Sequence, residues 1–114
     1  SSAPKIVVLS ARVGSIEDNN LGGWYSYRGS KAALNMMLKS ASLEFRRLNR
    51  SATFLAYHPG TVETALSEPF KSSVNAASLM SPTQAAEALD NVIDSLVSGE
   101  DFAYLDWQGK PIPW

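Results

Sequence analysis

Two residues of the stretch WYSYRGSKAAL, Tyr27 and Lys31, have types and a spacing that could do acid–base chemistry. They stand four apart, so on a helix they lie on one face, one turn from each other. A phenol, with a pKa near 10, exchanges protons poorly at neutral pH, and a nearby ammonium group favours the phenolate. A tyrosine prepared in this way can act as a general acid or base. The same spacing also suits an interfacial tyrosine and a solvated lysine at a helix entrance.

Alternating strand and helix patterns surround this pair and must position it. Continuous apolar runs predict strands buried on both faces, and apolar residues at helical spacing predict amphipathic helices. In chain order the expected elements are a strand at Lys5–Ser10, a helix at about 27–49, a strand at Ala52–His58, a helix at 81–99 and a strand at Phe102–Trp107. This alternation indicates an α/β fold with a parallel sheet.

The segments between these elements differ in how clearly they can be interpreted. Residues 11–23 carry three glycines and an Asp-Asn-Asn cluster, which predicts a long loop, and 61–80 reads as a loop with a short helix at most. The helix at 81–99 has the clearest boundaries: Ser81 is the expected N-cap, Pro82 the first helical residue, Gln84 the capping-box partner and Gly99 the stop.

Three strands are few for a sheet covered on both faces. We therefore expect residues 1–114 to be the C-terminal, catalytic half of a single larger α/β domain, with the N-terminal half outside this sequence. In such sheets ligands bind outside the carboxyl ends of the strands, which directs attention to the loops after Ser10, His58 and Trp107.

Composition excludes several classes of function. A net charge of −1 with scattered lysines and arginines gives no basic face for nucleic acid. The absence of cysteine and the single histidine, His58, rule out thiolate and polyhistidine metal sites, so no metal is expected. No apolar run approaches the length of a membrane span, and we expect a cytoplasmic protein without a membrane partner.

Three segments in the right order resemble the short-chain dehydrogenase/reductase family. SYRGSKAALNMMLKSASLEF is similar to its active-site helix, KIVVLSARVGSI to the preceding strand and turn, and YHPGTVETAL to the following strand with Pro-Gly and a threonine. Within that family the segments RVGSI, NNLGGWYSYRGSKAALN and GKPIPW are most similar to those of the C-factor-like and sniffer-like carbonyl reductases. The resemblance covers nearly the whole chain and implies a Rossmann-like, doubly wound parallel sheet.

The resemblance implies a role for each matched residue. Tyr27 would donate a proton to a substrate carbonyl as hydride arrives from NADP(H) or NAD(H), and Lys31 would prepare Tyr27 and hold the cofactor ribose. The predicted contacts to the nicotinamide end are Pro59, Gly60, Thr61, Val62 and Thr64. The substrate would be a small carbonyl compound or alcohol, and the helix at 27–49 would form a homo-oligomer interface.

The serine that usually orients the carbonyl is where the sequence departs from the family. Aligned on Gly14, the position most often catalytic holds Ala11. Ser10, one residue earlier, is our formal choice as the third catalytic residue, although on a strand it would point to the opposite side. Ser15 could instead reach the site from the loop, and turn chemistry explains either serine equally well.

Other features of the sequence leave alternatives open. No glycine-rich turn for a pyrophosphate is present, so we expect the chain alone to be inactive. Together with Ala11, this favours as an alternative a non-catalytic interaction or signalling protein that retains the fold. Trp24 and Tyr25 could line a substrate pocket or, as is commoner, pack a loop onto the sheet. His58 could face the cofactor or make a structural hydrogen bond.

Overall fold

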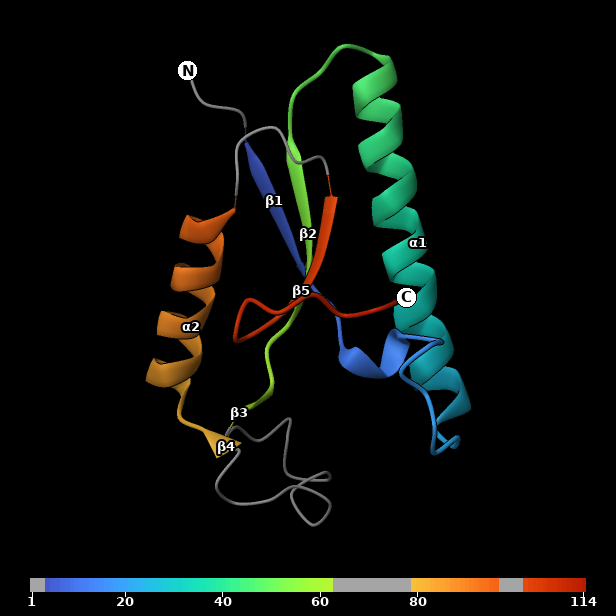
Figure 1. Cartoon of the computed structure of the whole chain (residues 1–114), viewed down its shortest axis with the longest axis vertical. Helices are drawn as coiled ribbons and strands as arrows, with labels where there is room; N and C mark the ends of the chain where they lie inside the picture. The colour runs from blue at the N-terminus through green and yellow to red at the C-terminus, as the bar shows by residue number, and fades with distance from the viewer. Residues whose placement is uncertain (1–3, 63–78, 97–101) are drawn as a thin grey trace.

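The computed structural model describes residues 4–62, 79–96 and 102–114. Its elements are, in order, β1 (Lys5–Leu9), the 3-10 helix η1 (Arg12–Gly14), α1 (Tyr25–Arg47), β2 (Thr53–His58), β3 (Thr61–Val62), β4 (Leu79–Met80), α2 (Pro82–Ser95) and β5 (Phe102–Asp106). Strands β1, β2 and β5 form a parallel sheet in the order β1-β2-β5. Figure 1 shows α1 and α2 on opposite sides of this sheet. The predicted α/β class with three parallel strands and two main helices is confirmed.

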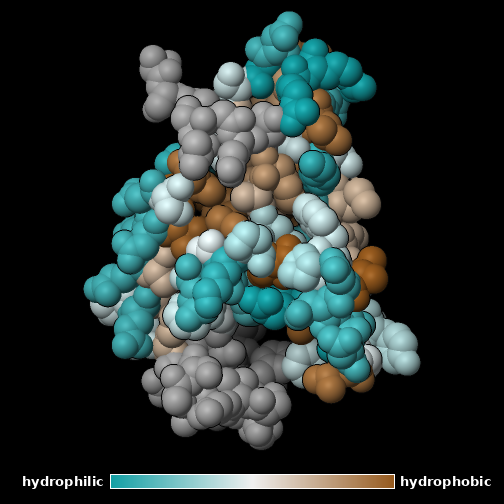
Figure 2. Space-filling model, in the orientation of Figure 1, coloured by the Kyte–Doolittle hydropathy of each residue, from teal (hydrophilic) through white to brown (hydrophobic). Residues whose placement is uncertain are grey.

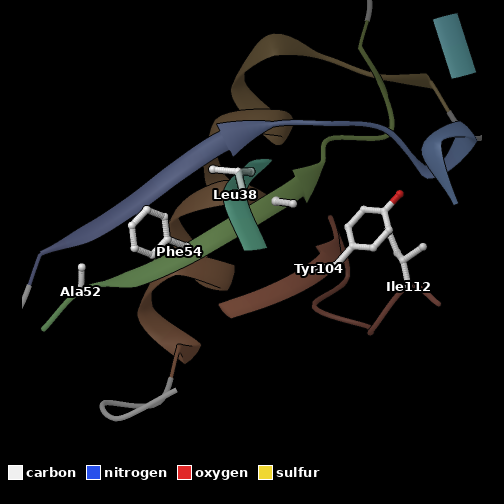
Figure 3. Packing of buried hydrophobic residues seen from close by; sticks show 6 residues of the cluster. Leu38, Ala52, Phe54, Tyr104 and Ile112 are labelled. Carbon is white, nitrogen blue, oxygen red and sulfur yellow. The ribbon is translucent and has the colours of Figure 1, made fainter. Parts of the chain in front are cut away.

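The central strand β2 explains why its sequence is apolar without interruption. Phe54 and Ala56 belong to the cluster that packs against α1, whereas Leu55 and Tyr57 belong to the cluster that packs against α2. Successive side chains of a strand point to opposite faces, so both sets need apolar neighbours. Figure 3 shows the first cluster, in which Leu38 of α1 lies over the sheet near Phe54.

Strand β1 is less buried than its sequence predicts. Ile6, Val7 and Val8 are half-buried, and Leu9 is 57% exposed. The reason is topological: β1 pairs with β2 on one side and is the edge strand of the described sheet. Its apolar composition therefore suits a strand with neighbours on both sides better than the edge position that it occupies.

Helix α1 spans 25–47, two residues earlier at each end than the predicted 27–49. Trp24, its N-cap, is in the left-handed region with φ 52° and makes no side-chain cap, so no cap signal marks the start in the sequence. At the other end Asn49 has φ 57°, and the amides of Asn49 and Arg50 donate back to helical carbonyls. Asparagine tolerates this conformation, which ends helices.

Helix α2 begins as predicted and ends earlier. The Ser81 hydroxyl accepts from the Gln84 amide at 3.2 Å, and the Ser81 amide donates to Gln84 Oε1 at 3.0 Å, which confirms the capping box. The helix ends at Ser95, because Leu96 adopts an extended conformation and is buried against β2. The predicted stop, Gly99, lies outside the described residues.

The described ends of the segment 61–80 are strands, which corrects the prediction of a loop with a short helix at most. Thr61 pairs with Leu79 and Val62 with Met80, so β3 and β4 form a short parallel ladder. Backbone pairing brings the two ends of the segment together beside the start of α2 (Figure 1). Residues 63–78, including Thr64, lie outside the described residues.

Candidate active site

Tyr27 and Lys31 lie together at the carboxyl edge of the sheet. The Lys31 Nζ is 5.7 Å from the centroid of the Tyr27 ring, a cation–π distance. The same Nζ donates to the carbonyl of Leu9, the last residue of β1, at 3.4 Å. The Tyr27 side chain is 41% exposed. A phenol accessible to a ligand and an ammonium group one turn away therefore meet where β1 ends, and this arrangement can exchange a proton with a bound molecule.

Gly14 allows the loop after β1 to lie against the Lys31 turn of α1. A Cβ on Gly14 would lie 2.9 Å from the Lys31 Cβ and 3.0 Å from the Lys31 carbonyl carbon. Real Cβ atoms essentially never come as close as 2.9 Å to another atom of this kind, so a residue larger than glycine would require η1 and α1 to shift apart. The glycine that served to align the sequence thus fixes the position of Lys31 relative to the loop.

Arg28, which the sequence analysis did not single out, holds the second half of this loop. Its Nε donates to the Gly23 carbonyl at 3.0 Å and its Nη2 to the Gly22 carbonyl at 3.2 Å. The two glycines have positive φ angles of 70° and 73°. The sequence did contain a signal for these hydrogen bonds: Arg28 follows Tyr27 directly, and two glycines, Gly22 and Gly23, lie a few residues before it.

The two candidate serines are both buried and hydrogen-bonded. Ser10 donates to Asn35 Oδ1 at 2.6 Å, and Asn35 lies one turn beyond Lys31 on α1. Ser15 donates to the Pro113 carbonyl and accepts from the Asp18 amide. Ser10 thus ties β1 to the active-site helix, while Ser15 ties the loop to the tail after β5. Their possible action on a substrate stays a prediction.

A polar cluster closes the same edge of the sheet behind the loop. Arg12 of η1 forms an ion pair with Asp106 at the end of β5, Nη2 to Oδ2 2.7 Å. The Arg12 amide donates to Nδ1 of His58, the last residue of β2, at 3.1 Å. Burial, and secondarily the charge of Arg12, lower the pKa of His58 to about 4, against an opposing effect of Asp106. His58 is therefore a neutral acceptor at pH 7 and makes the structural hydrogen bond that was one of its two interpretations.

Asp106 was also missed in the sequence, although it ends a strand at the predicted ligand-binding edge. It is 3% exposed, and its Oδ1 accepts from the amides of Gln108 and Lys110. A buried carboxylate requires such partners. The position of a lone acid at a strand end was the signal that could have identified it.

The Pro59–Gly60 turn follows β2 at the same edge, on the α2 side. Gly60 has φ 76°, and a Cβ there would lie 2.6 Å from the Met80 Cε and 2.9 Å from Trp107 Cδ1. Packing inside the chain thus already requires a glycine at 60. Thr61 and Val62 continue into β3. The cofactor contacts predicted for Pro59–Val62 and Thr64 stay predictions.

The other tyrosines of the chain differ from Tyr27 in burial or in partner. Burial raises the pKa of Tyr57, an effect increased by the Asp106 charge, and burial also raises the pKa of Tyr104. Tyr104 donates to the Ala11 carbonyl at 2.6 Å. Tyr25 is 89% exposed but has Gly29 one turn on. Tyr27 thus combines exposure with a neighbouring lysine.

Parallel strands, a Tyr-x-x-x-Lys helix and a Pro-Gly strand end are together the features of the short-chain dehydrogenase/reductase family, and comparison with known proteins confirms this resemblance. No protein-family model matches the chain. It is 36% identical over 110 residues to the C-signal of Myxococcus xanthus, covering 96% of the chain and 61% of that protein. It is 37% identical over 112 residues to 1-hydroxy-2-glutathionyl-2-methyl-3-butene dehydrogenase of Rhodococcus sp. (strain AD45), covering 96% and 46%.

Solved structures give the same result. The carbonyl reductase Sniffer of D. melanogaster matches with a TM-score of 0.76 and 26% identity, over 96% of this chain and 41% of that one. A protein of Burkholderia multivorans described as a short-chain dehydrogenase/reductase with bound NADP matches with a TM-score of 0.76 and 28% identity, over 96% and 44%. The chain thus spans about half the length of the relatives that it matches. Neither helix in the described ranges has the length and apolar content of a membrane span.

Proposed function

We propose that the chain is the catalytic part of an NAD(P)-dependent oxidoreductase that reduces carbonyl compounds and oxidises the corresponding alcohols. The observation that carries this proposal is the accessible Tyr27 phenol with the Lys31 ammonium 5.7 Å from its ring centroid. The similarity to a dehydrogenase and to carbonyl reductases supports the reaction type. The NADP bound by the Burkholderia multivorans relative supports NADP or NAD as the cofactor.

The residues at the edge of the sheet fit one end of such a cofactor. A phenol and an ammonium group are donors suited to ribose hydroxyls, and both are found where β1 ends. When bound, the nicotinamide would supply or accept the hydride. The sequence has no glycine-rich turn to hold a pyrophosphate, so these residues fit the nicotinamide–ribose end and not the rest of the cofactor.

Tyr27 performs the proton transfer in this proposal. In the reducing direction its hydroxyl gives a proton to the carbonyl oxygen as the carbonyl carbon gains hydride, which yields the alcohol and a Tyr27 phenolate. The Lys31 ammonium stabilises that phenolate until solvent returns the proton. In the oxidising direction the phenolate removes the alcohol proton instead. Gly14 and Arg28 hold the loop beside this pair.

The test uses the full-length protein that carries this chain, with NADPH or NADH and a panel of small aldehydes and ketones. Tyr27→Phe removes only the hydroxyl, and we expect kcat/KM to fall about 10²- to 10⁴-fold. Tyr25→Phe, the matched control on the same helix turn, should retain wild-type turnover. Equal rates for Tyr27→Phe and wild type would refute the proposed role of Tyr27.

The chain supplies the C-terminal half of one Rossmann-like domain in this account. Two observations support that organisation: the relatives are about twice as long, and β1 presents half-buried apolar residues at the edge of the sheet. We expect the full-length protein to bind NADPH and the isolated 114-residue chain to show neither binding nor turnover. Binding by the isolated chain would contradict this division.

Helix α1 also carries the proposed homo-oligomer interface. Met36 and Met37 are 66% and 68% exposed, and Leu43 is 44% exposed. Apolar side chains of this size on one long helix suit burial against a second copy. We expect Met37→Lys to reduce the oligomer mass measured by light scattering, and an unchanged mass would exclude this part of α1 from an interface.

A second candidate function is a non-catalytic signalling or interaction protein. The observation that favours it is that both candidate serine hydroxyls already donate a hydrogen bond within the chain, Ser10 to Asn35 and Ser15 to the Pro113 carbonyl. The position between them that is most often catalytic holds Ala11. The similarity to C-signal is consistent with it. Tight NADPH binding by the full-length protein without any Tyr27-dependent turnover would select this candidate over the enzyme.

A further inference from the structure

The backbone in front of Tyr27 is held in an unusual conformation. Gly22, Gly23 and Trp24 follow one another with φ of 70°, 73° and 52°. Glycine adopts such values readily, whereas a residue with a Cβ does so at a cost in energy. The loop carries that cost at Trp24, and Arg28 fixes the two preceding carbonyls. Strain of this kind at a residue beside a candidate site indicates that its side chain is needed there.

Trp24 places its indole beside the Tyr27 ring. The two ring centroids are 6.5 Å apart and the planes meet at 76°, an edge-to-face contact. A hollow of about 450 Å³ is lined by the segment 24–27. The hollow is wide open to solvent, so the segment offers one wall for a ligand and not an enclosed site. Figure 2 shows a small group of hydrophobic side chains at the lower right, where the loop before α1 lies; tryptophan and tyrosine are pale on its hydropathy scale, so this group is distinct from the aromatic segment 24–27.

Trp24 contacts the chain and still leaves about half of its surface accessible to a ligand. Trp24 is 51% exposed, and in the same loop Ile16 and Leu21 are 80% and 93% exposed. A loop pinned to the sheet by its aromatic residue would bury most of that residue. Arg28 and Gly14 anchor this loop through hydrogen bonds and close backbone contact, so the exposed part of Trp24 is not needed for that purpose.

We infer that Trp24 forms one wall of the substrate site and selects carbonyl compounds that carry a flat, apolar group. This inference rests on the proposed function, because Tyr27 marks where the carbonyl oxygen must lie. An indole face offers a broad apolar surface without a charge, so it stabilises an aromatic ring next to the reacting carbon better than a short alkyl chain. Trp24 is thus a specificity-determining residue for that site.

The test compares an aromatic with an aliphatic aldehyde, benzaldehyde and butanal, in the full-length protein with its cofactor. Trp24→Gly removes the wall and relieves the backbone, because glycine accepts φ 52°, so the variant keeps its fold. We expect the ratio of kcat/KM for benzaldehyde to that for butanal to fall about 3- to 10-fold. Trp24→Phe, which keeps a flat ring, should restore most of the ratio.

Leu21→Ala is the matched control, since Leu21 is the most exposed apolar side chain of the same loop. It should leave the ratio unchanged. An unchanged ratio in Trp24→Gly, or an equal fall in Leu21→Ala, would overturn the inference while the proposed reduction stands. If no aldehyde is turned over, saturation-transfer NMR of benzaldehyde decides: a signal lost in Trp24→Gly supports the wall, and a signal retained refutes it.

Discussion

Two groups of polar side chains lie at the carboxyl edge of the sheet and differ in how tightly they are held. The first group, Arg12, His58 and Asp106, comes from three different elements: the Arg12 side chain pairs with Asp106, and the Arg12 amide donates to His58. Tyr27 and Lys31 come from one helix turn and contact each other through a cation–π geometry only. The first group fixes the loop, and the second keeps its reactive atoms available.

This difference follows from the different requirements of a buried charge and of a proton donor. A buried charge such as Asp106 is stable only with its partners in place, so that group is rigid. A proton donor to a substrate must instead keep its hydroxyl available for that substrate. A rigid support such as the Arg12–Asp106 cluster can hold reactive groups in productive geometry while the Tyr27 ring stays 41% exposed.

The largest effect on stability is expected when the cluster of Arg12, His58 and Asp106 loses its carboxylate. Asp106→Ala removes the ion pair to Arg12 and leaves two backbone amides without their acceptor. We expect the free energy of unfolding of the full-length protein to fall by about 3 kcal/mol in urea titrations. Asp94→Ala, at an exposed position of α2, should change it by less than about 0.5 kcal/mol. Equal effects of the two variants would mean that the cluster does not stabilise the edge.

A second prediction concerns the seam between the two groups, where Gly14 of η1 packs against Lys31 of α1. Gly14→Ala inserts a Cβ 2.9 Å from Lys31, so η1 and α1 must separate, at a cost of about 1–3 kcal/mol. Thermal unfolding and kcat/KM should both report the change, since Lys31 moves with the seam.

Gly29→Ala is the matched control with the opposite sign. A Cβ at Gly29 meets nothing within 4 Å, and alanine favours the helix by up to about 1 kcal/mol. A destabilised Gly29→Ala together with a neutral Gly14→Ala would contradict the packing described for this seam.

The smallest expected effect is the dependence of folding stability on the titration of His58, which belongs to the cluster with Arg12 and Asp106. His58 has a folded pKa of about 4 against 6.5 for the free side chain. The unfolded chain therefore binds a proton first as pH falls, and stability present above pH 6.5 is lost progressively toward pH 4. His58→Asn keeps an acceptor for the Arg12 amide and removes this titration. Urea titrations from pH 7 to pH 4 should give a shallower decline for the variant, and identical declines would contradict the assignment.

Much of the fold was predictable, because the elements are encoded locally. The capping box at Ser81 and the apolar run of β2 each satisfy their own segment and fold as predicted. The start of α1 was misplaced because Trp24, the N-cap, carries no cap signal, and the loop before it is held through Gly22 and Gly23 by Arg28 from within the helix. The edge position of β1 was not visible in a pattern that reports composition and not neighbours.

The candidate site was predictable only in part. Tyr27 and Lys31 are one turn apart in sequence as in space, so their spacing was sufficient to bring them together. Asn35 and Asp106 act across 25 and 94 residues of chain. Contacts at such separation depend on the register of the sheet and the placement of α1, which no local pattern contains.

The central claim is that Tyr27 and Lys31 act as one unit in proton transfer. A double-mutant cycle in the full-length protein tests it most directly, with Tyr27→Phe, Lys31→Met and the double variant measured for NADPH-dependent aldehyde reduction under single-turnover conditions. We predict that the double variant is no slower than Tyr27→Phe alone, because residues acting as a unit lose their effect together. Losses that multiply in the double variant would contradict the account.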